Sequence, residues 1–320
     1  MTLLSYHVDQ AIAYLTIDDP VSKVNVLSRA LWSEFEDLLA EISVRQDLHG
    51  LIIESGKPGV FIAGADLKEL LQVPEVDHPP TRDFIEAGLH VLESIENLPY
   101  PTIALVDGVA LGGGLEVALA CDMRIAGTHR NTRFGFPEVS LALIPGWGGT
   151  QRLPRITGAT TALDMLLLNI HLDAESARYR GLVSDLFPSE QLRDQAVHLL
   201  QRARIHNWWQ DARQRKRSPM EPATKNITID TIKAGHFSDA QLNALSLSPD
   251  AFRSYRQQIE QEHKNSNCYQ AMQVLIDLVE QGSVLPLAKA IALETKQFLR
   301  LVAQPEARQN IADFFQKRKK

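Results

Sequence analysis

The stretch VALGGGLEVALACD, residues 109–122, places three consecutive glycines directly before an apolar run that reads as a helix. Glu116 is the only charged residue between Val109 and Cys121. A carboxylate that is buried without a partner either costs several kcal/mol or gives up its charge. Because Glu116 falls near the predicted helix start, where the helix dipole favours an anion, it is either a structural dipole partner or a functional carboxylate.

Around this stretch, short β-branched segments alternate with helical patterns through the first 190 residues. Strands are predicted at residues 11–18, 50–55, 102–108 and 123–127. One helix is predicted to begin after Ser28, a residue that suits an N-cap. Two further helices are predicted at 84–96 and 115–120. Strands interleaved with helices favour an α/β fold over an all-helical one.

The character of the chain changes after about residue 200. The segment starting WWQDARQRKRSP at Trp208 carries clustered basic residues and prolines, which predicts a linker or surface excursion. Its basic residues are Arg213, Arg215, Lys216 and Arg217. Contact with phosphates is one interpretation, but a solvated charged segment is far commoner. Apolar stripes at helical spacing return beyond residue 250. We therefore predict a core over 1–200, an irregular linker over 201–248 and a helical region over 249–320.

Composition narrows the function classes. An apolar fraction of 44% with 22% charged residues is typical of a globular protein, and a net charge of −6 does not suggest general nucleic-acid binding. Two cysteines cannot build a disulfide framework, so a reducing compartment is expected. The N-terminus lacks a signal-peptide pattern, and no apolar run approaches the ~20 residues of a membrane span. We expect a cytoplasmic protein.

Two further glycine-bearing segments accompany the first: FIAGADLKEL at 61–70, and FGFPEVSLALIPGWGGTQRLP at 134–154, which contains Glu138. Glycines before a helix expose backbone N–H groups to a phosphate or to an oxygen that gains charge in a reaction. Neither a GxGxxG fingerprint nor a Walker lysine is present, and the histidines show no metal-ligand spacing. Taken singly, tight turns and structural carboxylates remain the simpler interpretations. Taken together, Glu116 and Glu138 suit an acid/base pair with shifted pKa values.

These segments, with VDGVALGGGLEVALACDMRIA at 106–126 and AESARYRGLVSDLF at 174–187, resemble the enoyl-CoA hydratase/isomerase (crotonase) family over residues 1 to about 200. The resemblance implies an α/β fold built as a crotonase-like spiral of ββα units, followed here by an all-helical C-terminal extension. It implies an oxyanion hole, a pair of peptide N–H groups that binds the thioester oxygen, at Ala65 and Gly113. The family's catalytic glutamates fall on Glu116 and Glu138. The remaining implied roles are water positioning at Gly146 and CoA binding at Ala63 and Asp66.

The resemblance therefore implies a 2-enoyl-CoA hydratase (a lyase) that forms (3S)-3-hydroxyacyl-CoA in fatty acid β-oxidation. No metal and no separate cofactor are expected, because coenzyme A is part of the thioester substrate. Family isomerases commonly keep only the glutamate that matches Glu138, so the presence of Glu116 favours hydration, with isomerase activity as the alternative. Leu115, Phe136 and Trp147 are candidates for the acyl pocket, and the acyl chain length is left open.

The segments at 268–282 and 307–320 resemble the tail of the hydratase half of multifunctional β-oxidation enzymes, in which a 3-hydroxyacyl-CoA dehydrogenase domain follows. The expected partners are an acyl-CoA substrate, a second copy of the chain, or a dehydrogenase or thiolase. A non-catalytic acyl-CoA-binding subunit that docks such a partner is a further alternative. RNA binding through Arg213 to Arg217 has little support.

Overall fold

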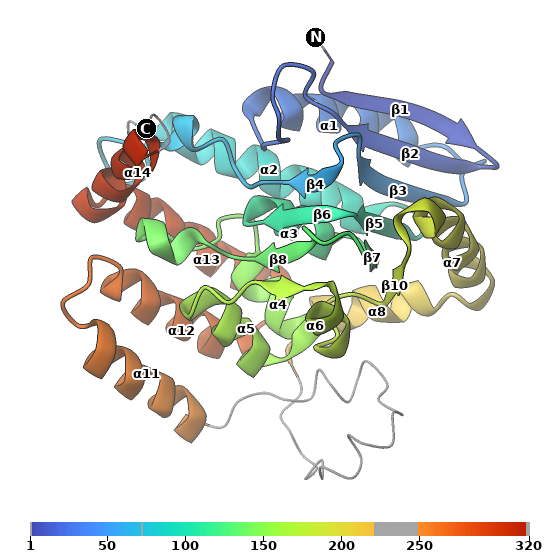
Figure 1. Cartoon of the computed structure of the whole chain (residues 1–320). Helices are drawn as coiled ribbons and strands as arrows, with labels where there is room; N and C mark the ends of the chain where they lie inside the picture. Colours follow the sequence, from blue (N-terminus) through green and yellow to red (C-terminus); the bar gives the residue numbers. More distant parts are fainter. Residues whose placement is uncertain (1, 72, 221–248, 318–320) are drawn as a thin grey trace.

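Two β-sheets and their covering helices make up the α/β part of the chain, as seen in the computed structural model (Figure 1). The structure describes residues 2–71, 73–220 and 249–317. The first sheet has the strand order β1-β2-β3-β5-β7-β10. These strands are Leu4–Asp9, Ile12–Ile17, Gly50–Ser55, Thr102–Val106, Met123–Gly127 and Asp185–Phe187. All neighbours in it pair in parallel except β1 and β2, which form an antiparallel pair.

The second sheet is smaller, with the order β4-β6-β8-β9. Its strands are Gly59–Ile62, Gly108–Leu111, Arg133–Gly135 and Leu172–Asp173. The neighbours β4, β6 and β8 are parallel, and β9 closes the sheet as an antiparallel strand. Because these strands are two to four residues long, each one quickly delivers the chain to the turn that follows it.

The two sheets are linked by a repeated strand–strand–helix unit. In three successive units the first strand (β3, β5, β7) joins the large sheet, and the second strand (β4, β6, β8) joins the small one. The helices that follow are α2, Pro79–Asn97, α3, Gly113–Ala120, and α4, Gly149–Thr157. The preceding hairpin β1-β2 leads into α1, Arg29–Ser43. This alternation confirms the predicted spiral of ββα units.

The strands of the large sheet and the start of α1 lie where the sequence predicts them. The predicted strands at 50–55 and 123–127 coincide with β3 and β7, and those at 11–18 and 102–108 are each two residues longer than β2 and β5. Ser28 is the N-cap of α1, and its hydroxyl accepts the N–H of Leu31 at 3.3 Å. The helix buries one apolar face, which includes Trp32, Phe35 and Leu39, against the core.

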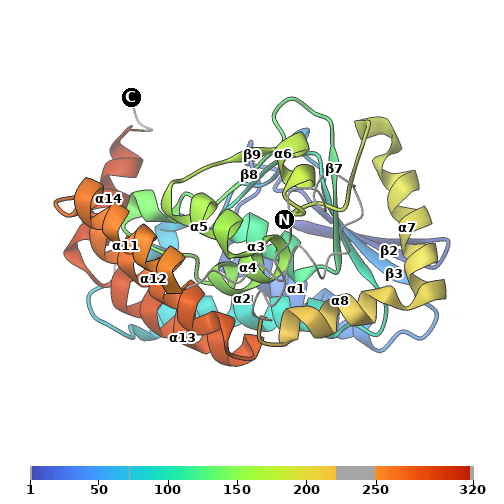
Figure 2. The ribbon, with the colours of Figure 1, turned by 90° about the horizontal axis from the view of Figure 1, so that it is seen from below.

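Helices complete the rest of the described chain. They are α5, Ala159–Leu167, α6, Ala174–Tyr179, α7, Leu192–His206, α8, Trp208–Arg217, α11, Pro249–His263, α12, Tyr269–Ser283, α13, Leu287–Val302, and α14, Pro305–Lys317. The helices α11 to α14 gather at one end of the molecule and α7 lies at the other (Figures 1 and 2). Beyond residue 248, the described chain therefore has the predicted helical character. None of the described helices is both long and apolar enough to cross a bilayer.

The interpretation of the basic segment at Trp208 as an irregular, solvated linker is wrong for residues 208–217, which form α8. Arg213 and Lys216 are only 7% and 6% exposed. The Lys216 ammonium donates to three carbonyls at the C-terminal end of α3, at 2.9–3.1 Å. Because helix C-termini carry partial negative charge, cations here satisfy internal acceptors. Residues 221–248 lie outside the described residues, and the domain boundaries at 200 and 248 stay predictions.

Candidate active site

The three glycine-bearing segments meet at one edge of the small sheet. Ala63 to Ala65 follow β4, Gly112 to Glu116 follow β6, and Phe136 to Glu138 follow β8. Since β4, β6 and β8 are parallel neighbours, their carboxyl ends point the same way and deliver these segments side by side. Loops at the carboxyl ends of parallel strands are the usual place for ligand sites in α/β folds. This edge is the candidate active site.

Two backbone N–H groups at this edge are candidates for binding an oxygen. Gly113 is the first residue of α3, so its N–H has no acceptor within the helix. Leu27 exchanges hydrogen bonds with Gly64 and Asp66, both at 2.9 Å, so the intervening N–H of Ala65 points away from Leu27. A Cβ on Gly64 would lie 3.6 Å from the carbonyl oxygen of Leu111, just before the glycines of α3. The two turns are therefore neighbours.

Glu116 is buried in the first turn of α3, with 1% of its surface exposed. Its Oε1 accepts the N–H groups of Trp147 at 2.8 Å and of Gly149 at 2.7 Å. Burial raises its pKa well above the ordinary value, and the neighbouring Glu294 and Glu138 carboxyls raise it further. The two N–H bonds oppose this rise because they stabilise the charged form. Glu116 is thus oriented through one oxygen and has the raised pKa of a functional acid or base.

Glu138 opens the 3-10 helix η2, Glu138–Leu141, and reaches the start of α3. Its Oε1 occupies the space beside Gly112, where a Cβ would lie 2.3 Å away. Its Oε2 is buried and has no hydrogen-bond partner among the described residues. Burial raises the pKa of Glu138 to about 8, with a smaller contribution from the Glu294 charge. A carboxyl with this pKa is protonated at neutral pH, and Glu138 can give up its proton.

A third carboxylate, Glu294 of α13, was not predicted from the sequence. It is fully buried, and its Oε1 accepts the N–H of Gly148 at 2.5 Å. Its Oε2 accepts the N–H and the hydroxyl of Thr150, at 2.9 and 2.5 Å. The signal in the sequence was a lone acid within the mixed stretch ALETKQFL, but nothing in that stretch linked it to a turn 146 residues earlier.

Arg152, in α4, also contacts the turn at residues 147–150. Its guanidinium donates to both oxygens of the buried Glu96, at 2.9 Å each, and to the carbonyl of Trp147 at 2.6 Å. The Arg152 and Lys216 charges hold the pKa of Glu96 at about 2 against the effect of burial. The positive charge of Arg152 is therefore largely matched by Glu96, and Glu96 remains ionised beside the site.

The other predicted site residues lie close by, and their proposed roles stay predictions. Ala63 donates its N–H to the carbonyl of Asn25 at 2.9 Å. The Asp66 carboxylate caps the 3-10 helix η1, Leu67–Leu70, by accepting the N–H of Lys68 at 3.1 Å. Gly146 is packed closely, since a Cβ there would lie 3.0 Å from the ring of Phe298. The N–H groups on Glu116 come from Trp147 and Gly149, the first of them next to Gly146 in sequence.

The three acyl-pocket candidates, Leu115, Phe136 and Trp147, are all buried. The Trp147 ring packs edge-on against Trp32 and Phe84, with centroids 5.2 and 5.3 Å apart. A Cβ on Gly113 would lie 2.5 Å from this ring, so the indole closes one side of the candidate oxyanion site.

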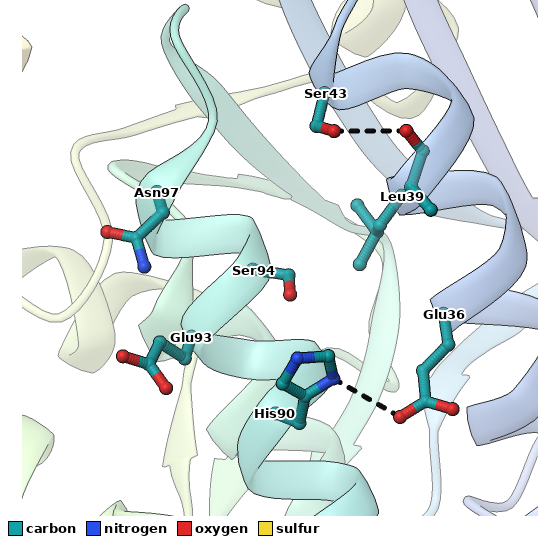
Figure 3. Close-up of a pocket in the computed structure, with 8 residues that line it drawn as sticks. Glu36, Leu39, Ser43, His90, Glu93, Ser94 and Asn97 are labelled. Atoms are coloured by element: carbon teal, nitrogen blue, oxygen red, sulfur yellow. Dashed lines mark hydrogen bonds and ion pairs between the residues drawn. The ribbon is translucent and has the colours of Figure 1, made fainter.

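A separate surface pocket of about 340 Å³ lies between α1 and α2 (Figure 3). His90 and Glu36 face one another across it, with 3.3 Å between Nδ1 and Oε1. None of the carboxylates Glu116, Glu138 and Glu294 lines this pocket. It is therefore distinct from the candidate active site.

Comparison with known families identifies the family of the chain. The family model described as enoyl-CoA hydratase/isomerase matches residues 7–244. The chain belongs to this family, which confirms the resemblance seen in the sequence and the crotonase-like fold.

Relatives extend the comparison beyond the family core. The fatty acid oxidation complex subunit alpha of Shewanella frigidimarina is 34% identical over 300 residues, 93% of this chain and 38% of the relative. The Aliivibrio fischeri protein of the same name is 33% identical over 303 residues, with 93% and 39% covered. The chain thus spans about two fifths of the length of these relatives.

Solved structures show the same fold. An enoyl-CoA hydratase from Bacillus anthracis has a TM-score of 0.60 at 28% identity, covering 82% of this chain and 96% of that one. An enoyl-CoA hydratase from Mycobacterium avium subsp. paratuberculosis has a TM-score of 0.62 at 18% identity, with 99% and 96% covered. The fold is therefore shared well beyond the range of close sequence identity.

Proposed function

We propose that the protein is a 2-enoyl-CoA hydratase, which adds water across the C2=C3 bond of a trans-2-enoyl-CoA to give (3S)-3-hydroxyacyl-CoA. The observation that carries this proposal is the convergence of two carboxyls beside outward N–H groups at one sheet edge: the buried Glu116, and the half-buried Glu138 with its buried Oε2. Hydration of a conjugated thioester needs a base, a proton donor and a site for a developing oxyanion.

In the proposed reaction, the N–H groups of Ala65 and Gly113 bind the thioester carbonyl oxygen. A water held between Glu116 and Glu138, with Gly146 assisting, attacks C3 as Glu116 takes one of its protons. The π electrons shift toward the carbonyl oxygen, and C2 then takes the proton of Glu138. Transfer of a proton from Glu116 back to Glu138 restores the site, so the net reaction is addition of one water.

The charges of the site support this division of roles. The pKa of Glu138 is raised to about 8, so it starts as the acid at neutral pH. Burial also raises the pKa of Glu116, and the two N–H bonds that it accepts at Oε1 oppose this rise by favouring its ionised form. Its Oε2 is left for the water. Two neighbouring carboxyls with one shared proton are a recurrent solution for acid/base chemistry.

The direct test is loss of enoyl absorbance when crotonyl-CoA is hydrated. We expect the wild-type chain to be active and Glu116→Gln to lose at least about 100-fold in kcat, as is typical for removal of a general base. Glu93→Gln, on the exposed side of α2, is the matched control and should keep wild-type activity. A wild-type chain that leaves the absorbance unchanged would refute hydration.

A Δ3-Δ2-enoyl-CoA isomerase is the second candidate, because Glu138 has a buried Oε2 without a hydrogen-bond partner and a raised pKa, so this residue alone can carry a proton between carbons. Isomerisation of a 3-enoyl-CoA should then survive Glu116→Gln and be lost in Glu138→Gln. Retention of both activities in Glu116→Gln would instead exclude an essential role for Glu116.

The relatives named as fatty acid oxidation complex subunits support a role in fatty acid β-oxidation and association with another subunit. We propose a dehydrogenase, a thiolase or a second copy of the chain as that partner. Light scattering after size-exclusion chromatography tests this association on three samples: the chain alone, the chain with 3-hydroxyacyl-CoA dehydrogenase, and the chain with thiolase. A monomeric mass of the chain in all three samples would count against association. The non-catalytic acyl-CoA-binding alternative is decided by the hydration assay: it is excluded if the chain hydrates crotonyl-CoA.

A further inference from the structure

Four consecutive backbone N–H groups at the start of α4 alternate between two carboxylates. Those of Trp147 and Gly149 donate to Glu116, while those of Gly148 and Thr150 donate to Glu294. The first turn of a helix has N–H groups without intrahelical acceptors, and here two acids from different helices, α3 and α13, accept them. The position of Glu116 therefore depends on a turn that α13 also holds.

We propose that Glu294 is a positioning residue for the hydration reaction, fixing residues 147–150 so that their N–H groups orient the Glu116 carboxylate. This inference rests on the proposed hydratase function. It adds Glu294 to the residues that the reaction needs besides Glu116 and Glu138. It also makes the C-terminal helical region a structural part of the active site.

Simple helix capping does not account for an acid at this position. A serine, asparagine or threonine caps a helix start without placing a charge in the interior. Burial of a third carboxyl beside two others is unfavourable, and burial raises the pKa of Glu294 to about 7 despite the bonds from Thr150 and Gly148. Such a cost at a functional site indicates a role in the chemistry.

The charge of Glu294 acts on the glutamate pair. Groups that interact with it are Glu116 on α3, Glu138 on η2 and Arg152 on α4, whose own partner is Glu96 on α2. The Glu294 charge raises the pKa of both Glu116 and Glu138. Its removal should therefore lower both pKa values and move the whole bell-shaped pH profile of kcat toward lower pH.

The test compares Glu294→Gln with Lys296→Gln, an exposed charge two residues further along α13. In Glu294→Gln one N–H of the turn loses its acceptor, so we expect kcat for crotonyl-CoA to fall about tenfold at the optimum. KM should change less than about twofold, because Glu294 is not proposed to touch coenzyme A. Lys296→Gln should match the wild type in kcat, KM and pH profile.

A purely structural role predicts a different result. It would lower the melting temperature and leave the pH profile of the folded fraction unchanged, which would overturn the proposal. Should Glu294→Gln fail to fold, Thr150→Val serves as the second variant, because it removes the hydroxyl bond to Glu294 and keeps the Thr150 N–H bond to the same oxygen. It also removes the bond that this hydroxyl accepts from Nε2 of Gln151. Loss of the hydroxyl bond to Glu294 weakens the ionised form of Glu294, so a smaller shift toward lower pH is expected, and an unshifted profile refutes the inference.

One readout does not depend on turnover. Titration of the Glu116 carboxyl carbon by 13C NMR should give a lower pKa in Glu294→Gln than in the wild type. If the wild-type chain fails to hydrate crotonyl-CoA, the hydratase proposal is wrong, and this titration still decides whether Glu294 acts on Glu116. If the wild type is active and the titration is unchanged, the Glu294 inference alone is wrong.

Discussion

Substitution of Gly112 by alanine should misplace Glu138 while leaving the rest of the site intact. A Cβ at Gly112 would lie 2.3 Å from Oε1 of Glu138, about 1.1 Å closer than the 3.4 Å of an ordinary contact. The Glu138 carboxyl must move by about that amount. A misplacement of about 1 Å at a reacting group costs on the order of 100-fold in rate.

The assay is steady-state hydration of crotonyl-CoA. For Gly112→Ala we expect kcat to fall about 100-fold with KM changed far less, because the carboxyl that moves is a proton donor in the proposed mechanism. The backbone at Gly112 has φ of +51°, so strain adds a stability loss of about 1–3 kcal/mol. Urea denaturation measures that part separately.

Gly181→Ala is the matched control, since Gly181 also has a positive φ, +74°, but follows α6 outside the carboxylate cluster. It should lose stability to a similar degree and keep kcat. A folded Gly112→Ala protein with kcat within about threefold of the wild type would show that the position of Glu138 does not limit the reaction.

Two further predictions concern stability. Because burial raises the pKa of Glu138 to about 8, its ionisation destabilises the fold as pH rises from its unfolded value through 8. Glu138→Gln should therefore melt about 2–4 °C above the wild type at pH 9 and lose this advantage below pH 4. Differential scanning calorimetry measures both melting temperatures. An equal difference in melting temperature at the two pH values would contradict this prediction. Lys216→Met leaves three α3 carbonyls without their donor and should cost about 2–4 kcal/mol in urea denaturation, whereas the exposed Arg215→Gln should cost less than about 0.5 kcal/mol. Equal costs for these two variants would show that the Lys216 contacts contribute little.

The large sheet could be predicted from the sequence because its central strands are five or six residues long and rich in branched apolar residues. The small sheet could not. Its strands β4, β6 and β8 span only three or four residues and adjoin the glycines, so no alternation or apolar run marks them. Their turns were recognised first as glycine-bearing segments and then through the family resemblance.

Charged residues gave the least reliable signals. The run at Arg213 to Arg217 predicted a solvated segment, yet Arg213 and Lys216 lie three residues apart on one face of α8 and are buried against internal acceptors. Glu294 carried a weak signal, because one acid in an amphipathic helix is compatible with many roles. Both cases depend on partners about 90 or more residues away, which local pattern cannot supply.

The bonds from Gly148 and Thr150 to Glu294 join residues 146 and 144 positions apart. Contacts of such high sequence separation form late in folding, because a long loop must close before they contribute. During synthesis, the ribosome must therefore release α13 before the turn at residues 147–150 gains its second acid. In a nascent chain that has folded only its sheets, the turn that orients Glu116 would lack its bonds to Glu294. Catalytic activity should therefore appear when α13 packs, rather than when the sheets form.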